Sequence, residues 1–269
     1  MLKTKLSIAV LIISSFISMS VASGSTFVGN RPVSDSIVIH NTRVHHFDST
    51  GLCTCIPHDI KDELIKALRI QLNKNAAPFV KAYIKKNGYF LGRTTKKNAR
   101  YFAIMDSVFE ENDLPVELKY LAFIESGLKY NAISHAGAVG PWAIMPVAAK
   151  EYGLKISKHR DERLDYYKST YAAASLLRDL YDKYGDWLLV IAAYNCGPGG
   201  VQKAIKKSGS RNFWALQNFL PEETRKHVKK FIAVHYYFEG HGSLVTMTKA
   251  ETEKHIKAVE AFASSAETQ

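Results

Sequence analysis

Hydrophobic residues recur at three- and four-residue intervals along most of the chain after Pro57, a spacing typical of amphipathic helices. Short stretches rich in glycine, proline and asparagine separate these segments. The pattern predicts a mainly α protein, with helices over residues 60–72, 78–86, 101–109, 115–126, 169–184, 187–196, 201–207, 221–235 and 246–262.

Several of these helices carry end signals in the sequence. Gly127 and Gly185 follow the last periodic residues of two helices and are predicted to stop them. Ser169 and Asp186 precede apolar periodic stretches and are predicted to be N-caps. Asn87-Gly88 is predicted to end the helix that begins at Pro78.

Three further segments depart from the helical pattern. Gly197-Pro198-Gly199 is predicted to break a helix. Residues 36–40 have the β-branched content of a short strand, within an otherwise extended lead-in. The Gly-rich segment from Ser134 to Pro146 is predicted to form a loop with a small strand element.

Glu125 lies near the end of an apolar helix, just before Gly127. Leu118, Leu121 and Ala122 precede it by seven, four and three residues, so these side chains share one helical face with Glu125. A carboxylate on an apolar face is costly to ionise, and the negative end of the helix dipole adds to the cost. We therefore expect Glu125 to stay protonated near neutral pH, as a general acid that expels a sugar oxygen must be.

The first 22 residues resemble a secretory signal peptide. Lys3 and Lys5 precede a mostly apolar run over residues 8–17, and Ser20-Val21-Ala22 supplies a small-residue cleavage site. The alternative is an uncleaved membrane anchor, but the run is short for a membrane span. We expect cleavage after residue 22 and export to the periplasm or cell envelope.

The 269-residue chain is basic, with 36 Lys and Arg against 25 Asp and Glu. A basic exported protein suits an anionic partner such as nucleic acid, lipid headgroups or the carboxylates of a cell wall, and charge alone does not choose among them. The sequence has no zinc finger, no aromatic RNA-binding signature and no long basic arm. We therefore expect no nucleic-acid partner, whereas peripheral association with a membrane or wall stays open.

The three cysteines do not indicate a disulfide framework. Cys53 and Cys55 are too close in sequence for an ordinary unstrained bridge, and the odd count leaves a thiol unpaired or intermolecular. His45, His46, Cys53 and Cys55 match no standard zinc spacing, so no metal site is predicted.

Four segments hold most of the candidate chemistry, at predicted helix ends and tight loops where functional side chains are often placed. They are Glu125-Ser126, the loop 134–146, the run 193–201 (Ala-Tyr-Asn-Cys-Gly-Pro-Gly-Gly-Val) and the run 220–225 (Leu-Pro-Glu-Glu-Thr-Arg).

Taken in this order, the segments resemble the catalytic domain of the soluble lytic transglycosylases, nearest the membrane-bound lytic murein transglycosylase D type. The resemblance runs from about Ala77 to Gly240. It includes the Glu-Ser pair, Gly-x-x-Gly-x-Trp-x-x-Met, Ala-Tyr-Asn-x-Gly-x-Gly-x-Val, and the shorter motifs at residues 161–165 and 221–225. One such motif is weak on its own, whereas the ordered set is specific.

The resemblance implies a mainly α, lysozyme-like (goose-type) catalytic domain with an N-terminal helical extension. The implied organisation is a signal peptide at 1–22, an extended and helical segment at 23–76, the catalytic domain at 77–240 and a helical tail at 241–269. The family cleaves the β-1,4 bond between N-acetylmuramic acid and N-acetylglucosamine in peptidoglycan, and leaves a 1,6-anhydro end. Peptidoglycan glycan strands are the implied partner. The chemistry is proton transfer alone, so no cofactor is implied.

Residue by residue, the resemblance makes Glu125 the sole catalytic acid and base. It places Ser134 near the N-acetyl or peptide part of the substrate, and Gly140 and Met145 along the cleft. The remaining substrate-binding candidates are Tyr194, Asn195 and Glu223. Each also has a structural interpretation: Glu125 as a satisfied buried acid, Tyr194 as a core residue and Glu223 as a partner of the helix dipole.

The sequence departs from the family pattern at three positions: Ala143 replaces a groove-lining glutamine, Cys196 an alanine and Lys229 a proline. Loss of one neutral hydrogen bond costs about 1 kcal/mol, too little to abolish catalysis.

Two alternatives remain. A hydrolytic muramidase would need a second acid, and the available acids are Asp161, Glu162, Asp165 and Glu223. A non-catalytic peptidoglycan-binding protein would use the same groove without cleavage.

Overall fold

The computed structural model describes residues 36–40, 43–47, 53–55 and 69–266. The predicted signal peptide at 1–22 and most of the predicted helix at 60–72 lie outside these residues, whereas 69–72 have no regular structure. None of the helices within the described ranges has the length and apolar character of a membrane span.

The chain divides into two compact units, residues 70–254 and residues 1–69 with 255–269. The described part of the second unit contains an antiparallel sheet in the order β1-β2-β3. It is built from β1 (Ser36–His40), β2 (Arg43–Phe47) and β3 (Cys53–Cys55). Ser36 is in register with Phe47, and His45 with Cys55. The strand predicted at 36–40 is confirmed, and the other two strands were not predicted.

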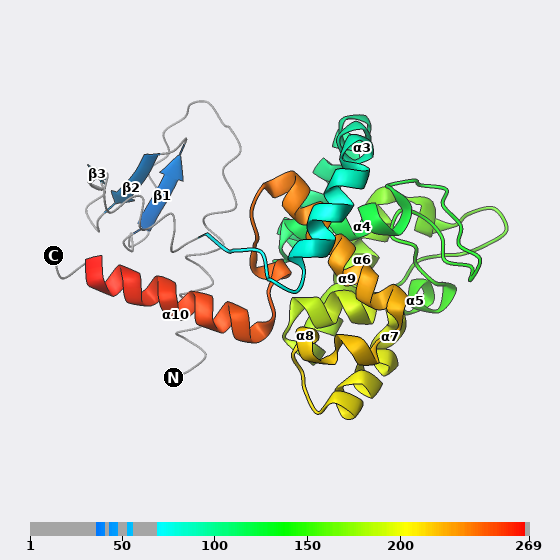
Figure 1. Cartoon of the computed structure of the whole chain (residues 1–269). Coiled ribbons are helices and arrows are strands. Elements are labelled where there is room, and N and C mark those ends of the chain that lie inside the picture. Colours follow the sequence, from blue (N-terminus) through cyan, green and yellow to red (C-terminus); the bar gives the residue numbers. More distant parts are fainter. Residues whose placement is uncertain (1–35, 41–42, 48–52, 56–68, 267–269) are drawn as a thin grey trace. The chain divides into compact units, whose positions relative to one another are not determined.

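The larger unit is helical, which confirms the predicted mainly α class (Figure 1). Its elements are α3 (Ala77–Glu111), the 3-10 turn η1 (Val116–Leu118), α4 (Lys119–Ser126), α5 (Pro146–Glu151), η2 (Glu162–Leu164), α6 (Tyr166–Tyr184), α7 (Trp187–Ser208), α8 (Phe213–Leu216), η3 (Gln217–Phe219), α9 (Glu222–Glu239) and η4 (Leu244–Thr246). The last helix, α10 (Lys249–Ala266), begins in this unit.

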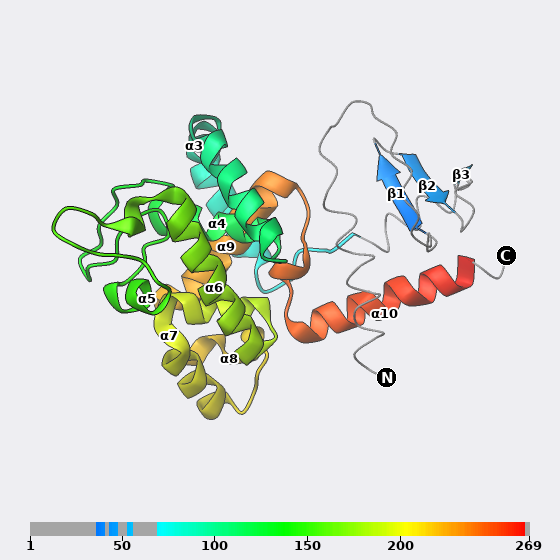
Figure 2. The same cartoon turned by 180° about the vertical axis from the view of Figure 1, so that it is seen from behind.

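Helix α9 lies at the centre of the helical unit and packs against α3, α4 and α7 (Figure 1 and Figure 2). Its fully buried Val228 and Phe231 join a core that includes Leu121 of α4 and Leu188 of α7. Burial of each such side chain contributes about 1.5–3 kcal/mol to folding. The core therefore fixes the end of α4, the middle of α7 and the first half of α9 against one another.

The predicted helix end at Asn87-Gly88 is wrong, because α3 continues through both residues. Gly88 instead lets the helix approach α9 closely, and its carbonyl accepts a hydrogen bond from the Tyr237 hydroxyl at 2.9 Å. A Cβ on Gly92, one turn later, would lie 2.9 Å from the same hydroxyl. Helical geometry is lost only at Asn98, with φ −115° and ψ 18°.

Most of the other predicted helix ends are confirmed. Gly127 and Gly185 end α4 and α6 in the left-handed conformation, with φ of 62° and 59°. The Asp186 side chain caps α7 by accepting from the backbone N–H of Leu189. Helix α7 is broken at Gly197, where φ is 76° and ψ is 157°.

The N-cap predicted at Ser169 is wrong. Helix α6 begins four residues earlier, where the Asp165 side chain accepts from the backbone N–H of Lys168 at 2.9 Å. Ser169 is buried, and its hydroxyl donates to the Asp165 carbonyl within the first turn. A serine that bonds back to the preceding turn is compatible with a helix interior, so the residue type alone did not mark the start.

Candidate active site

Glu125 lies in the last turn of α4, with the carboxyl on an open cavity of about 570 Å³. Leu121 and Ala122 are fully buried behind it, as the shared helical face predicted. The left-handed Gly127 ends the helix there and turns the chain away. The Ser126 hydroxyl donates to the Pro141 carbonyl at 2.8 Å, which ties this helix end to the Gly-rich loop.

The cavity brings together α3, the end of α4, the segment that follows it and α9. Two lysines, Lys129 and Lys230, line it together with Glu125. The other lining residues are Tyr83, Phe90, Phe123, Ile124, Ser126, Gly127, Asn131, Ala132 and Ile133. The mixture of apolar walls with a few charged groups is typical of ligand sites in proteins.

The Glu125 carboxyl has a partner that the sequence reasoning missed. Nε2 of His227, on α9, lies 2.8 Å from Oε1 of Glu125. The side chains of His227 and Glu125 are only 7% and 15% exposed. This contact joins residues 102 positions apart in the sequence.

Tyr194 and Asn195 occupy the last turn of α7 before its break at Gly197. The Tyr194 hydroxyl donates to the Trp142 carbonyl at 2.6 Å. Burial raises the pKa of Tyr194 well above its usual value, and the nearby Glu125 carboxyl raises it further, so the hydroxyl remains a donor. The Asn195 amide oxygen accepts from the Thr224 hydroxyl of α9 at 2.8 Å.

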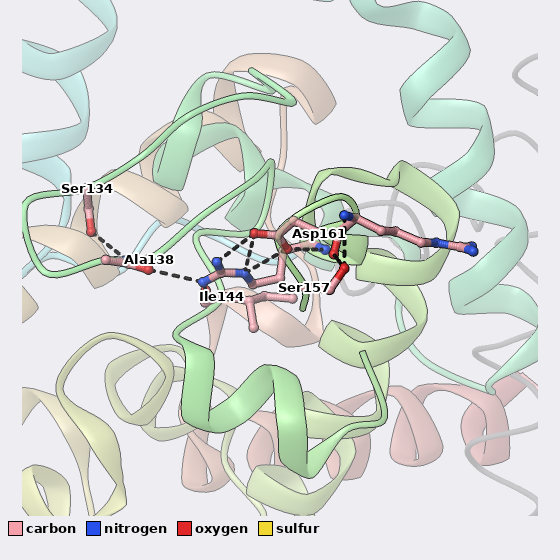
Figure 3. Close-up of polar contacts among 8 residues, drawn as sticks. Ser134, Ala138, Ile144, Ser157 and Asp161 are labelled. Carbon is pink, nitrogen blue, oxygen red and sulfur yellow. Dashed lines mark hydrogen bonds and ion pairs between the residues drawn. The ribbon is translucent and has the colours of Figure 1, made fainter. Parts of the chain in front are cut away.

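The Gly-rich loop is held by a compact set of polar contacts (Figure 3). The Ser134 hydroxyl accepts from the backbone N–H of Ala138 at 3.0 Å, which closes a tight turn. The buried guanidinium of Arg163 donates to the Gly137 and Ile144 carbonyls, each at 3.1 Å. Isolated antiparallel bridges pair Val139 with Ile133 and Ile144 where a small strand element was predicted, without forming a strand.

Gly140 has a packing role in this loop. Its φ is 86°, and a Cβ at this position would lie 2.0 Å from the Arg163 carbonyl oxygen. Gly140, which was predicted to lie along the cleft, is thus also a position where the loop backbone contacts the backbone of Arg163. Ala143, at the position of the family's glutamine, is half-buried with a positive φ of 50°.

Met145 and Glu223 lie at helix starts. Met145 is 42% exposed at the N-cap of α5. Glu223 is exposed in the first turn of α9, one turn before His227, so it projects from the same side of that helix. Neither residue lines the cavity beside Glu125.

The candidate second acids at 161–165 have structural partners. Asp161 pairs with Arg163 at 2.7 Å, and its hydrogen bond to that guanidinium lowers the pKa of Asp161. Glu162 is 7% exposed, and its hydrogen bond to Lys168 lowers its pKa to about 2. Asp165 caps α6. These carboxylates stabilise the segment that follows the Gly-rich loop, and none of them lines the cavity.

Comparison with known protein families gives a match over the part of the chain that carries Glu125. Residues 107–217 match the family model of the transglycosylase SLT domain. The matched segment contains Glu125, the Gly-rich loop and the Tyr194-Asn195 pair.

Curated relatives extend the similarity beyond the SLT domain. The chain is 38% identical over 157 residues to "Membrane-bound lytic murein transglycosylase D" of Escherichia coli strain K12. The protein of the same name from Escherichia coli O6:H1 gives the same identity over the same length. The match covers 56% of this chain and 34% of each relative, so the chain spans about a third of their length.

The fold is shared with a solved structure titled as the complex of the 70-kDa soluble lytic transglycosylase with bulgecin A. The TM-score is 0.51 at 20% identity, over 71% of this chain and 34% of the other. This likeness supports the lysozyme-like, mainly α architecture.

A sequence signal for His227 was available on α9. In the predicted helix at 221–235, Val228, Phe231, Ile232 and His235 recur at three- and four-residue spacing, and His227 precedes Phe231 by four residues on the same face. His227 also lies beyond the SLT segment at 107–217, two residues past the matched motif 221–225.

Proposed function

We propose that this chain is a peptidoglycan lytic transglycosylase with Glu125 as its catalytic acid and base. The observation that carries the proposal is the Glu125 carboxyl, which lines an open cavity at the end of a buried helix within the segment that matches the SLT domain. The relatives named lytic murein transglycosylase support the choice of substrate and reaction.

The proposed reaction breaks the bond between C1 of N-acetylmuramic acid and O4 of N-acetylglucosamine. Glu125 gives its proton to O4, and the substrate's own N-acetyl oxygen stabilises C1 as the bond breaks. The resulting carboxylate then takes the proton of the C6 hydroxyl as O6 closes on C1. The product has a 1,6-anhydro ring, no water is consumed, and Glu125 ends in its starting state.

The other site residues are proposed to bind the glycan around this carboxyl. Tyr194 and Asn195 lie in α7 where it meets α9, with the Tyr194 hydroxyl held as a donor. Ser134, Gly140 and Met145 belong to the loop that Ser126 ties to the end of α4. Glu223 projects from the α9 face that carries His227.

The acids of the 161–165 segment argue against the hydrolytic alternative. A second acid must activate water near the scissile bond. Asp161 and Glu162 form ion pairs, and Asp165 caps α6. None of these three acids lines the cavity beside Glu125. The proposed location is the periplasm or cell envelope, where peptidoglycan is found.

Mass spectrometry of peptidoglycan fragments tests the proposal. We expect wild-type protein to release fragments with anhydro ends, which are lighter by one water than hydrolysis products. Fragments with reducing ends would identify a muramidase instead.

The Glu125→Gln variant tests the assigned residue. An amide cannot donate the proton, so we expect cleavage to fall by at least about a thousandfold while glycan binding persists. Glu222→Gln is the matched control, because Glu222 is an exposed acid on α9 that pairs with Lys226. Wild-type wall clearance by Glu125→Gln would leave a glycan-cleaving role for Glu125 without support.

A further inference from the structure

The reaction proposed above gives no role to the histidine that contacts its acid. Nε2 of His227 lies 2.8 Å from Oε1 of Glu125, and both side chains are largely buried. Lys230, one turn later on α9, lines the same cavity as Glu125. The pair therefore lies beside the cavity but largely out of water, where a hydrogen bond is stronger than in solvent.

The second ring nitrogen identifies the tautomer. Nδ1 of His227 is buried and has no hydrogen-bond partner among the residues that the structure describes. A buried N–H without an acceptor costs more free energy than a bare ring nitrogen, and a charged ring would add a buried charge to that cost. The single ring hydrogen of neutral His227 thus belongs on Nε2, where it donates to Oε1 of Glu125.

We propose that His227 is a positioning residue for Glu125. As an Nε2–H donor, it holds Oε1 and leaves Oε2 to carry the transferred proton. The inference rests on the proposed function, because it requires Glu125 to act as an acid.

The test compares kcat and KM for wild type, His227→Phe and His227→Gln on purified peptidoglycan. Phenylalanine keeps the ring volume but removes the donor. We expect its kcat to fall at least about tenfold, because the carboxyl is no longer oriented. We expect its KM to stay within about threefold of wild type, because His227 contacts the acid and does not line the cavity.

The glutamine variant tests whether the hydrogen bond alone is needed. Its amide nitrogen reaches about as far as Nε2 of histidine and donates a hydrogen bond. We expect His227→Gln to keep kcat within about threefold of wild type.

Two outcomes overturn the inference. A kcat of His227→Phe within about threefold of wild type shows that the histidine does not position Glu125. Loss of activity in His227→Gln equal to that in His227→Phe shows that a hydrogen-bond donor at this position is not what Glu125 needs.

Thermal melting of each variant checks its folding. If His227→Phe does not fold, His227→Asn replaces it with the same expectation, because its amide is too short to reach Oε1. Reducing-end products from wild type, or an active Glu125→Gln, would refute the proposed function whatever the His227 variants show.

Discussion

At the scale of single residues, the Gly-rich loop depends on one close backbone contact. Gly140 combines a φ of 86° with a virtual Cβ position 2.0 Å from the Arg163 carbonyl oxygen. Gly137 has nearly the same φ, 85°, but a Cβ there would meet no atom within 4 Å. Substitution of Gly137 therefore measures the free-energy cost of the left-handed conformation alone, whereas substitution of Gly140 adds the cost of a steric clash.

We expect Gly140→Ala to destabilise the protein by more than about 2 kcal/mol, because a left-handed alanine costs about 1–2 kcal/mol before any clash. Gly137→Ala, the control, should cost about 1 kcal/mol, since only the backbone conformation opposes it. Urea denaturation followed by circular dichroism measures both. Equal losses would show that the contact with Arg163 does not constrain the loop.

At the scale of elements, a short acidic segment supports the loop that borders the site. Glu162 binds the Lys168 ammonium at 2.5 Å and accepts from the Lys155 backbone N–H at 2.9 Å. The hydrogen bond to Lys168 is the main reason that the pKa of Glu162 falls from 4.5 to about 2. A carboxyl with a lower pKa in the folded state stabilises folding fully above its unfolded pKa and loses that effect as the pH falls through the folded pKa.

We expect Glu162→Gln to lower Tm at pH 7. We expect the difference from wild type to shrink as the pH falls from about 4.5 to about 2, because the wild-type carboxylate is then protonated. Melting curves at several pH values measure this. The control, Glu222→Gln, removes an exposed pair with Lys226 and should change Tm very little. A Tm difference that is constant with pH would contradict the assignment.

At the scale of the whole molecule, the chain carries a formal charge of +11 at pH 7. Peptidoglycan carries carboxylates on its peptide stems, so the proposed substrate and the protein attract each other over distances set by ionic strength. This attraction adds to whatever contacts the cavity makes with sugars. The electrostatic attraction also does not depend on which glycosidic bond the protein cleaves.

We expect Glu125→Gln, which leaves the wall intact, to bind insoluble peptidoglycan about tenfold more weakly in 500 mM NaCl than in 50 mM NaCl. Co-sedimentation measures the bound fraction. Peptidoglycan with amidated carboxyl groups is the control and should show weaker binding with little salt dependence. A bound fraction that does not change with salt concentration would show that uncharged contacts with the sugars alone account for recognition.

The amino-acid sequence determined the features that depend on neighbours within a few residues. Helix periodicity, the stops at Gly127 and Gly185, the Asp186 cap and the break at Gly197 follow from local backbone preferences. The apolar face behind Glu125 and the ordered motifs also pointed to the candidate site. Ser169 failed as a cap because a serine is compatible with both a helix start and a helix interior.

Only the tertiary structure decided the contacts between distant positions. It placed Gly88 against Tyr237, Gly140 against Arg163, and His227 on Glu125. Local backbone preferences do not predict such contacts, because they form only when packing of the helices and folding of the Gly-rich loop onto Arg163 bring distant residues together. Local sequence patterns thus identify Glu125, whereas the placement of His227, which orients Glu125, depends on the fold.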